Sequence, residues 1–438
     1  MNLMIKMSQR MHWIPKTLFS TTACHAFPRQ VSEPPSHSRP YVPPNQRKVK
    51  FNLDKLSTLT GYEKIELLRD MHRANMAEKS LIVYQTLYTN GLLPRLKYHD
   101  HHCMFHVLMK DPKKYHQDIK KVWAWMTECR YRPSLNLYKD LIACTVVWRD
   151  LDLGLDLFKT MKSKGMHAPE EVYRDLLQLH VVSSGTKSTL DGIALWNELA
   201  ADSSLKPSLM SFCRAMELYG QVQDLQGIET VYTRAQTEIS KEPSPRMHIE
   251  NSYLSALVKS NANDKVQELY KTWTAPGNML AEDSFSHRAA LDSYNILLKM
   301  CHSSRNLPLA LAYLKDMEVR HLPLDTIMYG RLISLLGSHG KLLQAKALFD
   351  QAVVKLKVEP RSSRHMKLQT SLLEVLCSNN ECSGAETLFE SMTSTGSKIL
   401  KSSVKQMLDM YHRLNAPEKA LALQKRHEIQ ESTIDTQQ

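Results

Sequence analysis

Apolar residues recur three and four positions apart along most of the chain, as they do on the buried face of an amphipathic helix. The stretch LDSYNILLKMCHSSRNLPLALAYLKDM, from Leu291 to Met317, is one example. It contains two amphipathic segments separated by the polar run HSSRN. The pattern predicts two helices that fold back on each other around a short break.

The second helix of this hairpin carries a pair of apolar residues three positions apart, and the pair recurs. Residues three apart lie on one face of a helix. The pairs are Tyr84/Leu87, Trp123/Met126, Phe158/Met161, Trp196/Leu199, Tyr232/Ala235, Tyr270/Trp273, Leu314/Met317, Phe349/Ala352 and Phe389/Met392. Their first members follow one another at intervals of 35 to 44 residues. A period in this range indicates a repeat architecture.

Turn residues follow the same period. Several of the predicted second helices are followed by a proline turn, as in TECRYRPS, KSKGMHAPE and VRHLPLD. Gly165 and Gly396 come just after predicted helix ends, where the backbone is expected to be left-handed. Each unit therefore has the predicted order helix, break, helix and proline turn. One hairpin cannot bury its apolar face alone, so stacked units are expected to share a continuous core.

The units resemble pentatricopeptide repeats. SYNILLKMC and LALAYLKDMEVRHLPLD are similar to the two helices of that motif, and NLYKDLIACTVVWRDLDLGLDLFKTMKSKG and MYGRLISLLGSHGKLLQAKALFDQA are further copies. The tetratricopeptide repeat has a similar period, but its Trp-x-x-Leu-Gly-x-x-Tyr opening is absent here. The resemblance implies an all-α, right-handed α-solenoid of nine to ten helical hairpins over residues 53–426. The most similar group would be the fungal-type organelle RNA-processing factors.

The resemblance also implies base-reading positions for single-stranded RNA, one per unit. The main position follows the aromatic residue of the first helix and corresponds to Lys139, Arg174, Cys213, Asn251, Asn295, Gly330 and Thr370. Asn295 with Asp325, the last residue of the repeat turn, resembles the pair that favours uridine. Asn251 and Thr370 are acceptable readers with uncertain partners. An ordinary solvated or capping role is the alternative for each of them.

Cations on the first helices are expected to contact phosphates, which position an RNA without specifying its sequence. These residues are Lys139, Arg174, Arg214, Lys299 and Arg331. A solvated surface charge is the alternative interpretation of each. Because several reading positions depart from the family pattern, loose sequence specificity or recognition of a structured RNA is expected.

Residues 1–50 hold eight Lys or Arg and one acid, so they contribute +7 of the net charge of +12. Residues 1–30 mix spaced cations with apolar residues and hydroxyls, which is typical of a mitochondrial transit peptide. A disordered basic tail is the alternative. Residues 31–52 are expected to form a proline-rich linker, and residues 427–438 a disordered tail. The matrix of the mitochondrion is the expected location.

The sequence contains no apolar run of eighteen residues, so no membrane span is expected. The eight cysteines form no CxxC pair, which favours buried free thiols in a reducing compartment. No phosphate loop, HExxH motif or deaminase signature occurs. The run HDHHCMFH, from His99 to His106, has a ligand-like spacing but no second ligand pair, and is interpreted as a histidine-rich first helix. We therefore expect no enzyme activity, cofactor or metal.

Two functions follow from these expectations. The first is a monomeric protein that binds single-stranded mitochondrial RNA and acts in processing or maturation of ribosomal RNA or introns, in transcript stability, or in translation. The second is a protein-interaction scaffold, such as a factor associated with the mitochondrial ribosome or with assembly of a respiratory complex. The remaining 388 residues carry a net charge of only +5, which keeps the second function open.

Overall fold

The computed structural model of the chain is built from helical hairpins, as the sequence predicts. It describes residues 56–129, 131–183, 185–239, 243–274, 287–359, 362–394 and 401–425. No β-strand occurs in these ranges, and the predicted all-α solenoid is confirmed. The predictions of a transit peptide at 1–30, a linker at 31–52 and a tail at 427–438 concern residues outside the described ranges.

Within the described residues, ten helices open a unit, and each is followed by a second helix. The first helices are α1 (Gly61–Arg73), α3 (Tyr98–Leu108), α5 (Leu135–Trp148), α7 (Glu170–Val182), α9 (Leu209–Gln221), α11 (Pro243–Lys259), α13 (His287–Ser303), α15 (Thr326–Ser338), α17 (Ser363–Ser378) and α19 (Lys401–Arg413). The second helices are α2 (Ala77–Thr89), α4 (His116–Glu128), α6 (Leu151–Ser163), α8 (Thr186–Ala201), α10 (Leu225–Glu238), α12 (Asn263–Thr274), α14 (Leu307–Val319), α16 (Leu342–Lys355), α18 (Cys382–Ser394) and a last helix at 417–425. A short 3-10 helix, η3 (Leu93–Arg95), follows α2.

Local chemistry explains where the helices begin and where the chain reverses. Ser134, Ser208, Asp325 and Ser362 each accept a hydrogen bond from a backbone N–H in the first turn of the helix that they precede. Eight of the ten breaks inside the described hairpins use a left-handed residue. These residues are Asn75, Arg149, Gln223, Asn261, Arg305, Gly340, Asn380 and Asn415. Gly165 is left-handed as predicted, with φ of +73°, whereas Gly396 lies outside the described residues.

The apolar pairs form the core, but their two members are not equivalent. The second member of every pair is buried. Five of the first members are only partly buried, namely Trp123, Tyr232, Tyr270, Leu314 and Phe349. The buried side chains divide into two clusters, one reaching from Leu56 to Ala256 and one from Met247 to Ala420. Helix α11 contributes residues to both clusters, so it joins the two halves of the core.

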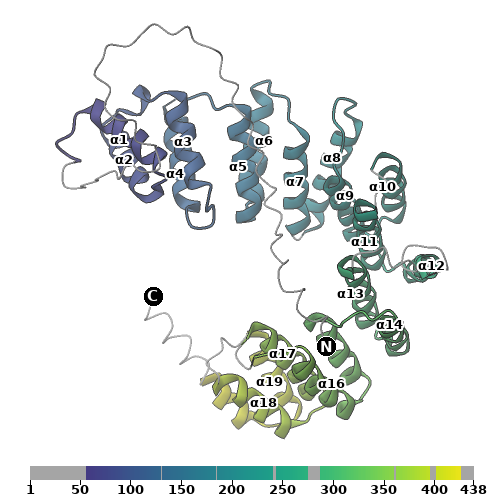
Figure 1. Cartoon of the computed structure of the whole chain (residues 1–438). Coiled ribbons are helices and arrows are strands. Elements are labelled where there is room, and N and C mark those ends of the chain that lie inside the picture. The colour runs from purple at the N-terminus through teal and green to yellow at the C-terminus, as the bar shows by residue number, and fades with distance from the viewer. Residues whose placement is uncertain are drawn as a thin grey trace, which may run out of the picture.

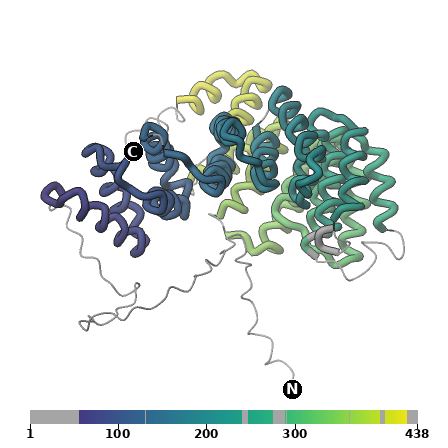
Figure 2. The backbone as a smooth tube through the Cα atoms, turned by 90° about the horizontal axis from the view of Figure 1, so that it is seen from above, coloured from purple at the N-terminus to yellow at the C-terminus, as the bar shows by residue number. Residues whose placement is uncertain are grey.

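Curvature follows from unequal packing in the two layers of helices. Successive first helices pack closely from α5 to α19, whereas successive second helices do not approach each other as closely in any described unit. The row therefore bends toward the first helices. Figure 1 shows the result, an open C in which α10, α12 and α14 lie outside α9, α11 and α13. Figure 2 follows the same row from above, from the purple N-terminal helices to teal and back through green to yellow. None of the helices in the described ranges is both long enough and apolar enough to cross a bilayer.

Candidate nucleic-acid interface

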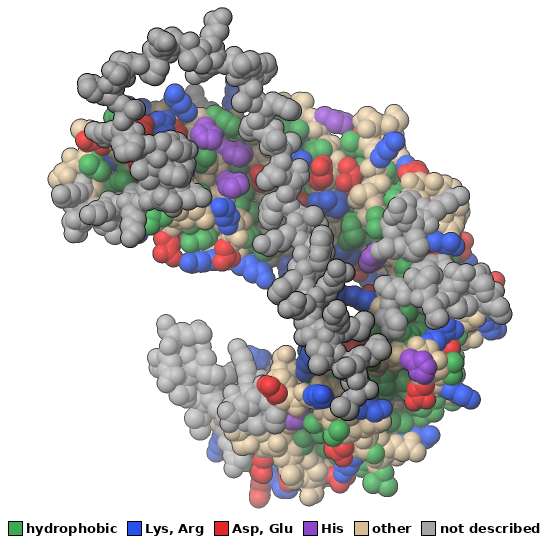
Figure 3. All heavy atoms as spheres, in the orientation of Figure 1, with side chains coloured by type: hydrophobic (Ala, Val, Ile, Leu, Met, Phe, Trp, Pro, Cys, Tyr) green, Lys and Arg blue, Asp and Glu red, His purple; other side chains and the backbone are tan. Residues whose placement is uncertain are grey.

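The expected reading residues share one register on the first helices. We call this set the inner row, and it comprises Lys139, Arg174, Cys213, Asn251, Asn295, Gly330 and Thr370. Each member directly follows a buried residue of its own first helix. Because the first helices form the inner layer of the bend, the inner row belongs to the hollow side of the C. Figure 3 shows that hollow open between the two arms, with basic and acidic side chains mixed on the visible face.

Asn295 and Asp325 are brought together as the sequence predicts. The Asn295 side-chain amide donates from Nδ2 to Asp325 Oδ2 at 2.8 Å. The other carboxylate oxygen of Asp325 accepts from the Met328 backbone N–H at 2.8 Å. Asp325 therefore caps α15 and orients Asn295 at the same time.

Arg331 contacts the same asparagine from the next unit. Its Nη1 donates to the Asn295 backbone oxygen at 2.6 Å and to Asn295 Oδ1 at 2.9 Å. Burial lowers the pKa of Arg331, while Asp325 acts in the opposite direction. An arginine stays charged in proteins because its ordinary pKa is so high. Arg331, which was predicted to bind a phosphate, therefore holds Asn295, which was predicted to read a base.

Asn251 and Thr370, the other two expected readers, are both partly buried. Asn251 Oδ1 accepts from the Ser293 hydroxyl of α13 at 2.6 Å. The Thr370 hydroxyl donates to the Met366 carbonyl of its own helix at 2.8 Å. Asn251 therefore resembles Asn295 in being held from the following unit, whereas Thr370 is held by its own backbone.

Cys213 and Gly330 offer little to a base. Cys213 is 6% exposed, and burial raises the pKa of its thiol. Gly330 is buried, and a Cβ at this position would lie 2.9 Å from Ser371 Oγ in α17. The units that begin with α9 and α15 therefore lack a strongly hydrogen-bonding side chain at the inner row.

Three of the predicted phosphate ligands are paired with acids. Lys139 lies 3.4 Å from Glu171 in the next unit, and Arg174 bonds to its neighbour Asp175 at 2.9 Å. Burial raises the pKa of Asp175 although Arg174 opposes this effect. These acids reduce the positive charge that the row presents to an RNA.

Arg214 belongs to a small charge network. Glu217 accepts from Arg214 at 3.0 Å and from Lys259 in α11 at 2.6 Å. Two cations therefore share one carboxylate, and this network keeps a net positive charge.

Lys299 is the exception among the predicted phosphate ligands. It is exposed on α13, one turn after Asn295, and no hydrogen bond or ion pair joins it to the described residues. The structure adds two inner-row positions that the sequence reasoning missed, His102 in α3 and Lys405 in α19. The signal that could have found them is the buried residue just before each, His101 and Val404, neither of which is a Tyr or a Phe.

The histidine-rich run forms α3, the first helix of the second unit. Figure 3 shows histidine side chains gathered on the N-terminal arm over this helix. His101 is buried, and a hydrogen bond of 2.7 Å joins its Nδ1 to the Tyr84 hydroxyl. In the part of the chain that the structure describes, no three His, Cys, Asp or Glu side chains are grouped to hold a metal ion.

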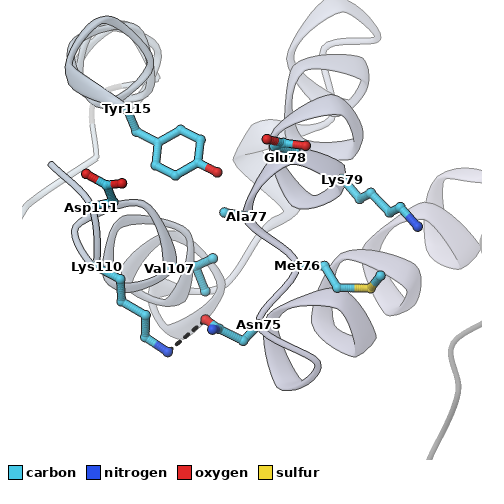
Figure 4. A pocket seen from close by; sticks show the side chains of 9 residues that line it. All are labelled: Asn75, Met76, Ala77, Glu78, Lys79, Val107, Lys110, Asp111 and Tyr115. Carbon is cyan, nitrogen blue, oxygen red and sulfur yellow. Dashed lines mark hydrogen bonds between the residues drawn. The ribbon is translucent and has the colours of Figure 1, made fainter. Parts of the chain in front are cut away.

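Two cavities in the described part of the chain lie at the ends of helices. Figure 4 shows one of about 380 Å³ between the α1–α2 turn and the end of α3. Lys110 Nζ donates to Asn75 Oδ1 across its edge at 2.7 Å. Another cavity of about 360 Å³ is polar and lined by Arg305, Ser338, Glu374 and residues around them at the C-terminal ends of α13, α15 and α17.

Comparison with known proteins agrees with this geometry. The PPR repeat family matches residues 292–322, 327–355 and 370–397, which overlap the hairpins from α13 to α18. A mitochondrial pentatricopeptide repeat-containing protein of Arabidopsis thaliana is 21% identical over 286 residues, which is 65% of this chain and 44% of the relative.

Solved structures share the fold. PPR10 in complex with an 18-nt psaJ RNA element superposes with a TM-score of 0.58 at 18% identity, covering 86% of this chain and 55% of that one. A cysteine-to-serine variant of the same complex gives the same values. The chain thus spans about half the length of the relatives that it matches. The predicted helical register, the observed hairpins and the three matched segments lead to one conclusion: the chain carries pentatricopeptide repeats at 292–322, 327–355 and 370–397, and it shares the helical-hairpin fold of solved pentatricopeptide repeat proteins.

Proposed function

We propose that this protein binds single-stranded RNA along the hollow side of its solenoid and acts in RNA metabolism of mitochondria, without catalysing a reaction. The observation that carries the proposal is the Asn295–Asp325 pair, an amide oriented by a carboxylate at 2.8 Å in the inner layer of helices. PPR10, which has the same fold, was solved with a bound RNA element, and the Arabidopsis relative is mitochondrial.

Physical chemistry supports an unpaired strand as the ligand. An asparagine offers a donor and an acceptor side by side, which can pair with the edge of a base. Only unpaired bases expose their Watson–Crick edges to a protein side chain. The exposed cations Lys299 and Lys405 lie on first helices of the same layer and would attract phosphates.

The inner row supports modest sequence specificity. Asn295 has the complete pair of contacts, and Asn251 and Thr370 are further proposed readers. Cys213 and Gly330 are buried and leave their units without a polar reader. Lys139, Arg174 and Arg214 are proposed to contact phosphates in competition with the acids beside them. Binding would thus depend on a few bases within a longer strand.

Retention of RNA from a random single-stranded pool tests the proposal. The full chain would be immobilised and the pool applied at 50 mM and 200 mM KCl. Each phosphate contact contributes about −0.7 to the slope of log K against log salt for a single strand. We expect retained RNA and a slope of about −2 to −4, from three to five contacts. No retained RNA at 50 mM KCl would refute the proposed function.

The place of action has a separate test. We propose the mitochondrial matrix, where the RNA would be a precursor of ribosomal RNA, an intron or a messenger. Fusion of residues 1–30 to a fluorescent protein should direct it into mitochondria, and deletion of these residues from the full chain should leave it outside. Crosslinking in isolated mitochondria, followed by sequencing, would then identify the bound transcript.

A protein scaffold is the second candidate function, and the paired cations favour it. Lys139, Arg174 and Arg214 each have an acid within 3.4 Å, so part of the inner layer is electrically balanced. A protein partner such as the mitochondrial ribosome would suit a balanced surface better than a bare phosphate chain. Sedimentation with a ribosomal subunit that persists in high salt and after ribonuclease treatment would favour the scaffold over RNA binding.

A further inference from the structure

The contact between Arg331 and Asn295 spans two repeat units. Arg331 lies in the second turn of α15 and Asn295 in the middle of α13. One nitrogen, Nη1, donates to both the backbone oxygen and the side-chain oxygen of Asn295. Arg331 is partly buried, so its guanidinium exchanges few of these contacts for water.

The two ends of the Asn295 amide have different chemistry, and rotation about its last torsion exchanges them. Oδ1 only accepts hydrogen bonds and Nδ2 only donates them. This torsion is broad and roughly two-fold in asparagine, so a free side chain can present either order of donor and acceptor. A free amide can therefore adapt to different bases.

In this structure both ends of the amide are held. Nδ2 donates to Asp325 at 2.8 Å, and Oδ1 accepts from Arg331 at 2.9 Å. An exchanged amide would place Nδ2 against the guanidinium and Oδ1 against the carboxylate, so both contacts would become repulsive. One N–H and one lone pair remain available for a base in a fixed order.

We infer that Arg331 is a positioning residue that fixes the Asn295 amide, so that the base-reading centre of this unit consists of Asn295, Asp325 and Arg331 from two adjacent units. This inference rests on the proposed RNA binding. It differs from the expectation that Arg331 neutralises a phosphate. A phosphate ligand changes the salt dependence of binding, whereas a positioning residue changes the preference for a base.

Lys299 provides a matched control on the same face. It lies on α13 one turn after Asn295 and has no ion pair with the described residues. Substitution of Lys299 by Met removes one positive charge while keeping most of the apolar stem. It should lower the steepness of the salt dependence by about 0.7 and leave the base preference unchanged.

The experiment uses the full chain and a 5′-fluorescein-labelled RNA that the wild type selects from a random pool. Comparison with Asn295→Ala identifies the base that Asn295 reads. Fluorescence anisotropy then measures the Kd for this RNA and its three variants at that base, between 50 and 250 mM KCl. The proteins are wild type, Arg331→Met, Arg331→Lys, Asn295→Ala, the double variant Asn295→Ala/Arg331→Met and the control Lys299→Met. Circular dichroism confirms that each variant is folded.

We expect Arg331→Met to reduce the base preference at this position at least threefold and to leave the salt slope unchanged. Arg331→Lys should retain the base preference only in part, because an ammonium cannot reproduce the geometry of the guanidinium. In the Asn295→Ala background, Arg331→Met should have no further effect on base preference, because the residue acts through Asn295.

Three results would overturn the inference while leaving RNA binding intact. The first is an unchanged base preference in Arg331→Met with a salt slope that is shallower by about 0.7. The second is an additive effect of the two substitutions on base preference. The third is a selected RNA in which Asn295→Ala relaxes no base. A wild-type chain that retains no RNA would instead refute the proposed function, and the inference with it.

Discussion

Gly337 allows α15 and α17 to pack closely, and its substitution by Ala tests how much this contact contributes. A Cβ at Gly337 would lie 2.8 Å from the Val375 Cβ and closer still to both Val375 methyl carbons. The β-branched Val375 has little freedom to turn away. Asn379 also donates to the Gly337 carbonyl at 3.1 Å, so separation of the helices would strain this hydrogen bond. Gly337→Ala should therefore push the two helices apart.

The magnitude follows from opposing effects. Overpacking a close contact costs about 1–3 kcal/mol, and a weakened hydrogen bond costs about 0.5–1.5 kcal/mol. Replacing Gly by Ala in a helix contributes up to about 1 kcal/mol in the other direction. The net expectation is a loss of about 1–3 kcal/mol, although Ala is ordinarily the better helix former.

Hydrogen exchange is the appropriate assay, because a repeat array unfolds in local segments. Amides in α15 and α17 should exchange about 5- to 150-fold faster in Gly337→Ala, the equivalent of that free-energy loss. Gly330→Ala in the same helix is the control, since its Cβ would meet only the Ser371 hydroxyl, which can rotate. It should exchange at the wild-type rate or more slowly. Slower exchange in Gly337→Ala than in wild type would refute the packing argument.

Two further predictions concern the N-terminal half of the core. Phe158→Ala should lower the free energy of unfolding by about 3–5 kcal/mol, because the ring is buried and packs edge-on against Tyr173 with 5.5 Å between the ring centroids. Hydrogen exchange should become faster in α5 to α8 and stay unchanged in α15 to α18. A uniform increase in exchange rate would contradict the view that each repeat is stabilised only by its neighbours. Burial lowers the pKa of His101 to about 4, below the ordinary 6.5, so the unfolded chain binds a proton that the folded chain does not. This contribution to stability should be complete above pH 6.5 and decline as pH falls toward 4, and the urea midpoints at pH 5.0 and 7.5 measure it. His101→Gln should reduce the difference between the two midpoints without removing it, because burial also lowers the pKa of His72 to about 4. Equal midpoints in the wild type would contradict the prediction.

The hairpins could be predicted from the sequence because their signal is local. Each apolar pair needs only residues three apart, and the second members are all buried in the structure. The pairs could not show which other side chains of a helix pack into the core beside them. In α14 the side chain of Tyr313 is fully buried, whereas the predicted anchor Leu314 is only partly buried. The adjoining units determine which face of a helix packs into the core.

The candidate site was predictable only in part. The Asn295–Asp325 pair followed from the register of a known motif, and the hydrogen bond between the two side chains agrees with it. The hydrogen bonds from Arg331 to Asn295 could not be predicted from a local sequence pattern, because the two residues are 36 positions apart. That separation is one repeat period, so pairs one period apart on first helices are the signal to search for. The pairing of Arg174 with adjacent Asp175 was visible in the sequence as neighbouring charges but not as a contact.

Helix α11 gives residues to both clusters of the core, and this double membership has a mechanical consequence. A load applied to the two ends of the C would pass through α11, because residues of this helix belong to both clusters of buried side chains. Any change in the packing of α11 would therefore reach both arms of the C.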